Sequence, residues 1–196
     1  MMNYHFFAVL SRMKYIERWA LMRSSRPENL SEHSLETAMI AHALCLIGNV
    51  RYGKDLDCEK AALIGMYHDA SEIITGDMPT PVKYYSDEIR SAYRQVEAIA
   101  ENRLLDHLPD DLRPYYHEIL KNDDEQLYRY VKAADKLSAL IKCIEERSAG
   151  STEFKEAYKS TLASLEKMKA DVPEIEDFMK DFLDGYGKTL DELLTK

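Results

Sequence analysis

The chain has 196 residues, of which 45% are hydrophobic and 31% are charged, and its formal net charge is -9 at pH 7. This length is enough to bury a full hydrophobic core, so we expect one domain over residues 1–196. The negative charge argues against a broad surface for nucleic-acid polymers, because such surfaces are rich in Lys and Arg. No apolar run approaches the roughly 20 residues that cross a membrane, and the N-terminus lacks the basic leader of a signal peptide.

The cysteines indicate a reducing compartment. Cys45, Cys58 and Cys143 form no CxxC pair, and their number is odd. Both features argue against a disulfide framework. Cys45 and Cys143 lie within apolar patterns and are expected to be small core residues. We therefore expect a cytoplasmic protein that is not bound to a membrane.

A short helix is predicted over residues 3–13, followed by a basic stretch. Residues 14–27 lack clean periodicity and contain Arg18, Arg23, Arg26 and Trp19. One interpretation is a solvated loop with Trp19 inserted into the core. The other is a lip that offers guanidinium groups to a phosphate and an indole face to a base or sugar.

A long helix is predicted from residue 32 to about residue 50, with Ser31 as its N-cap. Its apolar residues recur at three- and four-residue steps, which predicts the buried face. This face contains Leu35, Ala38, Met39, His42, Ala43 and Leu46. We interpret His42 as a hydrogen-bonded core histidine. His33 lies in the first turn, where a histidine is more often a surface or core residue than a ligand.

Residues 61–72 form an apolar run that ends in His68, Asp69 and Glu72, with Asp57 ahead of it as an N-cap. Such a segment should lie in the core, yet burying an imidazole and two carboxylates without partners is costly. A metal ion would satisfy them, because imidazole and carboxylate are common ligands. Glu72 lies on the same side of a helix as His68 and Asp69 and could hold a water molecule bound to the ion.

A rigid loop follows Glu72, because Gly76, Pro79 and Pro81 exclude a regular helix. This loop is either a stiff connector or a ligand-facing segment that uses Asp77, Thr80 and Lys83. Helices are then expected over residues 86–108, from 123 or 124 to 150, over 153–169 and over 174–186, with a short helix or link at 110–121 and a last short helix capped by Thr189 and Glu192.

The predicted fold class is all-α, a single helical bundle, because no segment alternates with a period of two for long enough to form a strand. Asp135 lies at the border of the apolar face of the helix that begins at residue 123 or 124. It is either the structural partner of an arginine or a metal ligand.

Taken together, His33, His68, Asp69 and Asp135 give the order His…His-Asp…Asp, which resembles the HD-domain phosphohydrolase superfamily. The surrounding stretches look like the bacterial 5'-deoxynucleotidase family, the YfbR-type enzymes. These stretches are Glu17-Arg-Trp-Ala-Leu-Met-Arg23, Glu28-Asn-Leu-Ser-Glu-His-Ser-Leu35, Met66-Tyr-His-Asp-Ala-Ser-Glu72, Thr75-Gly-Asp-Met-Pro-Thr-Pro-Val-Lys83 and Lys132-Ala-Ala-Asp-Lys136. The resemblance extends through nearly the whole chain and is weaker after about residue 150.

The resemblance implies one divalent metal ion, with cobalt preferred and manganese or zinc as alternatives. Its ligands would be His33, His68, Asp69 and Asp135. The implied catalytic residues are Glu72 and Arg18, the latter orienting the phosphate. The implied substrate contacts are Arg18, Trp19, His33, Asp69, Asp77, Met78, Pro79, Thr80 and Asp135. Met78 stands where the family usually has leucine, a swap that conserves volume.

The implied activity is hydrolysis of deoxyribonucleoside 5'-monophosphates, with loose base preference, by a homodimer. The ion would activate a water molecule and neutralise phosphate charge, and Glu72 would align that water or accept its proton. Three alternatives remain open: an HD hydrolase of a dNTP or an alarmone, an iron-dependent oxygenase with a second metal, and a non-catalytic nucleotide-binding HD protein. A dNTP or alarmone hydrolase should have more basic residues near the site, and an oxygenase should have further histidines for its second metal. A non-catalytic protein should have lost some of the metal ligands.

Overall fold

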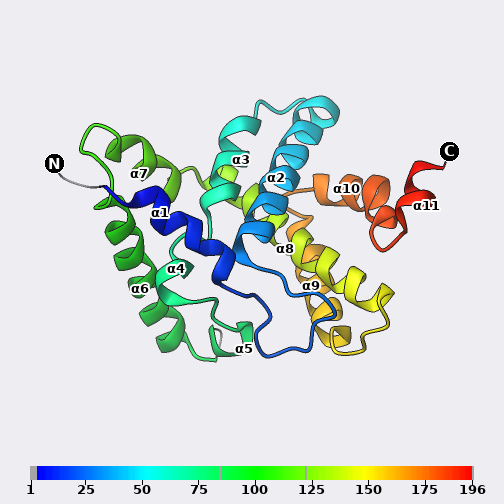
Figure 1. Cartoon of the computed structure of the whole chain (residues 1–196). Helices are drawn as coiled ribbons and strands as arrows, with labels where there is room; N and C mark the ends of the chain where they lie inside the picture. The colour runs from blue at the N-terminus through cyan, green and yellow to red at the C-terminus, as the bar shows by residue number, and fades with distance from the viewer. Residues whose placement is uncertain (1–3, 84, 122, 196) are drawn as a thin grey trace.

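The computed structural model describes residues 4–83, 85–121 and 123–195, and this part of the chain is all-α, as predicted (Figure 1). The longer helices are α2 Leu30–Tyr52, α3 Cys58–Tyr67, α6 Asp87–Leu105, α7 Arg113–Lys121, α8 Glu125–Ser148, α9 Lys155–Met168 and α10 Glu174–Phe182. The shorter ones are α1 Phe6–Leu10, α4 Glu72–Thr75, α5 Thr80–Lys83 and α11 Leu190–Leu194, with 3₁₀ turns η1 Ser11–Tyr15 and η2 Leu183–Gly185. The helix predicted over residues 3–13 is thus split into α1 and η1, and its residue 3 lies outside the described residues.

The core is built around α2 and α8, which pack against each other and against α3 (Figure 1). Helix α10 packs on α2, and α9 packs on α8. A second apolar cluster joins Phe6, Ala70 and Leu104 at the side of the molecule that α1, α6 and α7 form. Among the described residues, no helix combines the length and the apolar character needed to span a bilayer.

Helices α2 and α3 approach closely at Gly65. A Cβ atom at this position would lie 2.9 Å from the Cα atom of Ala38, which real structures essentially never show. The missing side chain therefore permits the contact between the two backbones. Because His33 lies at the start of α2 and His68 directly after α3, this crossing decides how far apart the two imidazoles lie.

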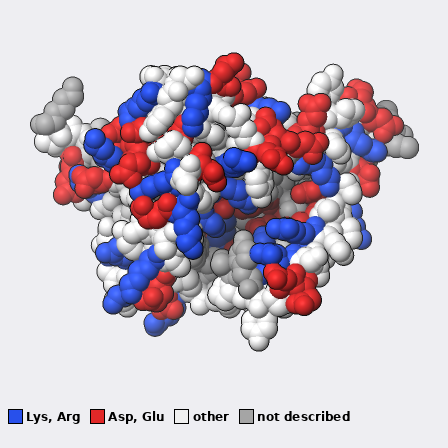
Figure 2. Space-filling model, turned by 180° about the vertical axis from the view of Figure 1, so that it is seen from behind, with Lys and Arg blue, Asp and Glu red and all other residues white. Residues whose placement is uncertain are grey.

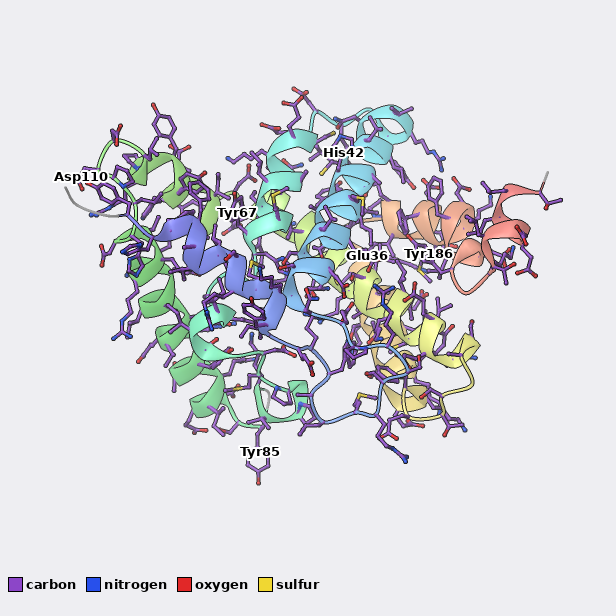
Figure 3. The ribbon with its side chains drawn as sticks, viewed as in Figure 1. Glu36, His42, Tyr67, Tyr85, Asp110 and Tyr186 are labelled. Atoms are coloured by element: carbon purple, nitrogen blue, oxygen red, sulfur yellow. The ribbon has the colours of Figure 1, made fainter. Side chains whose placement is uncertain are left out.

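The predicted buried face of α2 is wrong in part: Ala38 is buried and Ala43 packs against the core, but the larger side chains are not buried. Leu35, Met39 and Leu46 are exposed to 55%, 59% and 48%, and His42 is also exposed, not a core histidine (Figure 3). The buried face contains instead His33, Thr37, Ile40, Ala41, Leu44 and Ile47. Apolar residues occur on both sides of this helix, so the periodicity fits either face.

The caps that the sequence predicts are largely confirmed. Asp57 accepts from the backbone N–H of Lys60, Ser86 caps α6, and Thr189 forms a capping box with Glu192. The cap of α2 is Asn29, however, not Ser31. The Asn29 side chain accepts from the N–H groups of Ser31 and Glu32, and the Glu32 carboxylate accepts from the N–H of Asn29.

Glu146 fastens the stretch before α2 to α8. Its carboxylate, 1% exposed, accepts hydrogen bonds from the backbone N–H of Ser25 and from the ammonium of Lys142. The same ammonium donates to the carbonyl oxygen of Arg26. Burial opposes ionisation of Glu146, but these donors prevail and lower its pKa to about 2.

Replacing Glu146 with glutamine is expected to reduce the free energy of unfolding by about 3–5 kcal/mol, because the Lys142 charge stays buried without its partner. Urea denaturation at pH 7 measures this loss. Since the pKa is lowered on folding, the stabilisation is complete above the unfolded pKa of about 4.3 and is lost as the pH falls through about 2. The exposed Glu156→Gln is the control, and an equal effect of both changes would contradict this role.

Candidate active site

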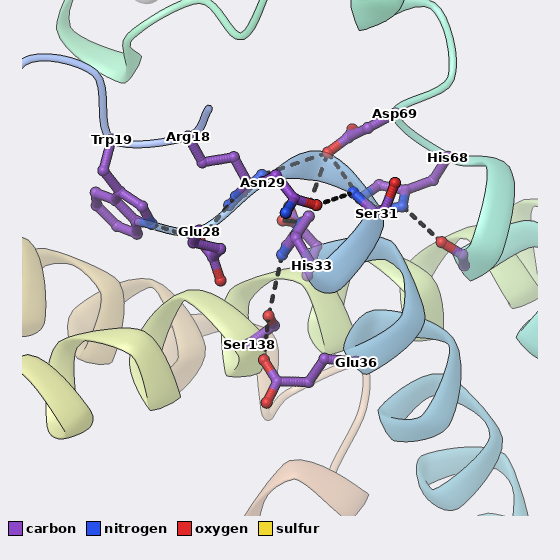
Figure 4. Close-up of polar contacts among 12 residues, drawn as sticks. Arg18, Trp19, Glu28, Asn29, Ser31, His33, Glu36, His68, Asp69 and Ser138 are labelled. Atoms are coloured by element: carbon purple, nitrogen blue, oxygen red, sulfur yellow. Dashed lines mark hydrogen bonds and ion pairs between the residues drawn. The ribbon is translucent and has the colours of Figure 1, made fainter. Parts of the chain in front are cut away.

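The four predicted metal ligands converge from three elements, and Figure 4 shows three of them, His33, His68 and Asp69. His33 projects from the first turn of α2, His68 and Asp69 directly follow α3, and Asp135 lies within α8. The Nε2 atom of His33 is 3.2 Å from Oδ1 of Asp135 and 3.5 Å from Oδ2 of Asp69. Nε2 of His68 is 3.1 Å from the same Oδ2 atom. Ligand atoms of His33, His68 and Asp135 all lie within 4.8 Å of one another.

The donor atoms at this cluster fit a metal ion. The Nε2 atoms of His33 and His68 are buried and have no hydrogen-bond partner among the described residues. Both rings are held through the other nitrogen: Nδ1 of His68 lies 2.7 Å from the Gly65 carbonyl oxygen, which can only accept, and Nδ1 of His33 lies 3.0 Å from Ser138 Oγ. Such second contacts orient ligand imidazoles in metalloproteins.

The charge states also suit a cation. Burial, followed by the Arg18 charge, lowers the pKa of His33, so this imidazole is neutral at pH 7. Burial raises the pKa of the Asp135 carboxyl, but Lys136 and the contact with His33 outweigh burial and hold it well below its ordinary value. Neutral imidazole and ionised carboxylate are the forms that bind metal.

Glu72 begins α4 and is 6% exposed. Its Oε2 atom has no hydrogen-bond partner among the described residues. Burial, with smaller contributions from Asp69 and Asp77, raises its pKa to about 9. A cation at the cluster would favour the ionised form.

Arg18 connects the cluster, through Asp69, to the predicted substrate contact Trp19, through Glu28. Its Nη1 atom lies 3.4 Å from Asp69 Oδ2, and its Nε donates to Glu28 at 3.1 Å. The same Glu28 oxygen accepts from the indole N–H of Trp19 at 2.8 Å. Burial lowers the pKa of Arg18, but Asp69 and the other nearby carboxylates more than offset this and leave its pKa raised. Glu28 therefore fixes both predicted substrate contacts in one geometry.

Trp19 has a left-handed backbone with φ of 60°, a rare conformation for a bulky residue. It is held on several sides: its backbone N–H bonds to Asp77, its indole bonds to Glu28, and its ring packs edge-on against Phe154 at a centroid distance of 5.3 Å. Non-glycine residues in such conformations cluster at functional sites, where surrounding contacts compensate the strain.

A cavity of about 910 Å³ lies beside the cluster, large enough for a small ligand. Arg18, Trp19, Asp77, Met78 and Pro79 from the predicted set line it, together with Lys136. The four cluster residues are not among its lining residues, so Arg18 and Lys136, which contact Asp69 and Asp135, form the connection.

Two further predicted residues of the 73–83 loop, which contains the one-turn helices α4 and α5, have different outcomes. The side chain of Thr80 lies outside the described residues. The Lys83 ammonium lies 2.9 Å from a Glu97 oxygen and is engaged by that carboxylate.

The wall of the cavity opposite the loop had no counterpart in the sequence analysis. It is formed by one face of α9, which presents Ala157, Ser160, Thr161 and Ser164. Their spacing of three to four residues follows one side of a helix. Nothing in these residue types suggests a ligand. Glu28 has no distinctive feature in the sequence beyond its place in a family motif. The fold alone therefore shows the α9 wall and the role of Glu28.

Comparisons with known proteins identify the family. The family model described as 5'-deoxynucleotidase YfbR-like matches residues 5–186. A 5'-deoxynucleotidase of Vibrio parahaemolyticus is 48% identical over 191 residues, covering 96% of this chain and 97% of the relative. An HD-domain phosphohydrolase from Listeria innocua is 24% identical with a TM-score of 0.81, over 93% of this chain and 88% of that one.

The fold is shared more widely. The cyanophage S-2L HD phosphohydrolase DatZ, solved bound to dA and one catalytic Zn²⁺ ion, is 21% identical with a TM-score of 0.65, over 93% of this chain and 96% of that one. The match of the family model over nearly the whole chain, together with the HD-type order of residues on an all-α fold, leads to one conclusion: this chain belongs to the 5'-deoxynucleotidase YfbR-like family.

Proposed function

We propose that this enzyme hydrolyses deoxyribonucleoside 5'-monophosphates to deoxynucleoside and phosphate, using one divalent metal ion held by His33, His68, Asp69 and Asp135. The activity follows from membership in the family. The observation that carries the site is the convergence of two Nε2 atoms, which make no hydrogen bond among the described residues, on the half-buried carboxylates of Asp69 and Asp135. Cobalt, manganese and zinc all suit such ligands, and cobalt is proposed from the family resemblance.

The residues around the cluster divide the chemistry between them. A bound divalent ion would supply positive charge that neutralises the phosphate and acidifies water. Glu72 accepts the proton of the attacking water, the bond between phosphorus and the 5'-oxygen breaks as the new bond forms, and the released 5'-oxygen takes up a proton from solvent water. Arg18 stabilises negative charge on the phosphoryl oxygens. Asp77 accepts a hydrogen bond from the 3'-hydroxyl of the sugar.

The nucleoside is proposed to occupy the cavity between the 73–83 loop and α9. Trp19, Met78 and Pro79 line one side, Thr80 belongs to the same segment, and the α9 face forms the other side. The wall on α9 presents Glu156, Ala157, Ser160, Thr161 and Ser164, and Glu153 lines the cavity just before this helix. Loose base preference is proposed from the family resemblance.

A monophosphate fits better than a triphosphate or an alarmone. Cations near the cavity are engaged by carboxylates: Lys83 by Glu97, and Arg23 by Glu153. Lysine, arginine and carboxylate side chains are interspersed over the face in Figure 2, with no continuous basic surface for a nucleic-acid polymer. Phosphate release from dAMP, but not from dATP, with cobalt or manganese added is the expected result. Equal rates on both would contradict the proposal.

Trp19 is proposed to select deoxyribose by leaving no room for a 2'-hydroxyl. Trp19→Ala is expected to lower the ratio of kcat/KM for dAMP to that for AMP by about tenfold. Steady-state phosphate release from both nucleotides measures the ratio. Tyr15→Ala, which removes an exposed ring outside the cavity, should leave the ratio unchanged. An unchanged ratio in Trp19→Ala would show that another residue excludes the hydroxyl.

We also propose that the enzyme is a cytoplasmic homodimer built from one domain, residues 1–196. The exposed apolar residues of α2 and α3 support this, because such patches mark interfaces. Leu35, Met39 and Met66 line a shallow groove there, of about 320 Å³.

Met39→Glu is expected to convert the dimer into a monomer in analytical ultracentrifugation, because the charge would be buried without a partner at the interface. Tyr85→Glu, at a more exposed side chain elsewhere (Figure 3), is the control. A dimer that persists in Met39→Glu would exclude this face as the interface.

A further inference from the structure

The two histidines of the cluster are held in different ways. Nδ1 of His68 meets a backbone carbonyl oxygen, so a proton must reside on Nδ1 and the lone pair is on Nε2. Nδ1 of His33 meets the hydroxyl of Ser138, which can either donate or accept. The tautomer of His33 therefore depends on what the Ser138 hydroxyl does with its one proton.

Glu36 decides the direction of that hydroxyl. Ser138 Oγ lies 2.6 Å from Oε2 of Glu36, one turn along α2 from His33 (Figure 4). Ser138 Oγ is the donor in this contact. Burial raises the pKa of Glu36 to about 7, against the hydrogen bond from Ser138, and the ionised form of this carboxylate can only accept that proton. The Ser138 oxygen must then accept from His33 Nδ1–H, which leaves the lone pair on Nε2. That atom is the one that lies 3.2 Å from Asp135 Oδ1.

The opposite order would disable the site. If Glu36 donated to Ser138, the hydroxyl would donate to Nδ1 and the His33 proton would move to Nε2. A protonated Nε2 cannot bind a metal ion. Because Ser138 is fully buried and His33 is 1% exposed, no bulk water replaces the hydrogen bond between these two residues, whereas Glu36 is half-buried.

We propose that Glu36, acting through Ser138, is a positioning residue that sets the metal-binding tautomer of His33. The inference rests on the proposed metal site. Neither residue contacts the cavity, and both lie on the far side of the His33 ring from the cluster. Their effect is therefore on metal affinity, and it reaches the reaction only through the bound ion.

The test measures cobalt binding to the full-length protein, through the visible absorption of the bound ion and by calorimetry. Ser138→Ala and Glu36→Ala are each expected to raise the cobalt Kd by about 10- to 100-fold, the usual effect of removing a partner of a ligand histidine. The double variant should lose no more than Ser138→Ala alone, because Glu36 acts only through the hydroxyl. Phosphate release from dAMP should approach the wild-type kcat at saturating cobalt.

Ser34→Ala is the matched control. This serine is adjacent to His33 on α2, is buried, and has a hydroxyl without a hydrogen-bond partner among the described residues. Its removal should change the Kd by less than twofold, and thermal unfolding of the metal-free proteins shows that all variants fold. Wild-type affinity in Ser138→Ala and Glu36→Ala would overturn this inference alone. A wild-type protein that binds no cobalt would overturn the metal site and this inference with it.

Discussion

Glu72→Gln is expected to lower kcat for dAMP hydrolysis by about 10²- to 10⁴-fold, the usual contribution of a positioned general base. Glutamine keeps the shape of the side chain but cannot accept the proton of the attacking water. Cobalt binding should remain, because Glu72 is not one of the four cluster residues. Phosphate release at saturating dAMP and cobalt measures the loss.

The same change should stabilise the metal-free protein at pH 7 to 8. The pKa of Glu72 is raised on folding to about 9, first by burial. The folded protein therefore holds this proton more tightly than the unfolded chain, and stability falls as the pH rises from about 4.3 towards 9. Glutamine is neutral throughout and avoids this loss. Glu59→Gln, at an exposed glutamate of α3, is the control. In the activity measurement, a wild-type kcat for dAMP in Glu72→Gln would exclude the proton-accepting role.

Removing Asp135 is expected to abolish both metal binding and hydrolysis. In the wild type, a metal ion at about 100 times its Kd should stabilise the fold by about 2.7 kcal/mol. For a chain of this length, such a gain raises the Tm by about 5–10 °C. Asp135→Ala should show no rise on addition of cobalt, because the cluster loses a carboxylate that directly faces His33. A chelator should remove the rise in the wild type.

Asp123→Ala is the control for this measurement, since it removes an exposed aspartate just before α8. It should keep the full metal-dependent rise in Tm and full phosphate release. A rise in Asp135→Ala equal to that of the wild type would exclude Asp135 as a ligand.

Much of the fold could be predicted because its helices are marked locally. Side chains such as Asp57, Ser86 and Thr189 satisfy N–H groups that any helix leaves unpaired, so they indicate its start without knowledge of the rest. The face of α2 could not be predicted in this way. Its apolar residues surround the helix, and which of them meet α8 and α10 depends on partners far away in the sequence.

The candidate site also contains residues that the sequence predicts and residues that only the fold shows. His68 and Asp69 could be predicted, because they are polar residues at the end of an apolar run. The partners that hold the ligands could not: Ser138 and Glu36 are separated by 102 residues, and neither stands out in composition or spacing. Glu28 likewise reads as an ordinary surface acid until the fold places it against Arg18 and Trp19.

The contact at Gly65 bears on the size of the proposed ion site. The distance between the backbone segments that carry His33 and His68 depends on how closely α2 and α3 cross. An added methyl group at position 65 would push α2 and α3 apart and increase the distance between His33 and His68 without changing any proposed ligand. Selection among ions of different radius can therefore act on helix packing, at a residue that touches neither the cation nor the nucleotide.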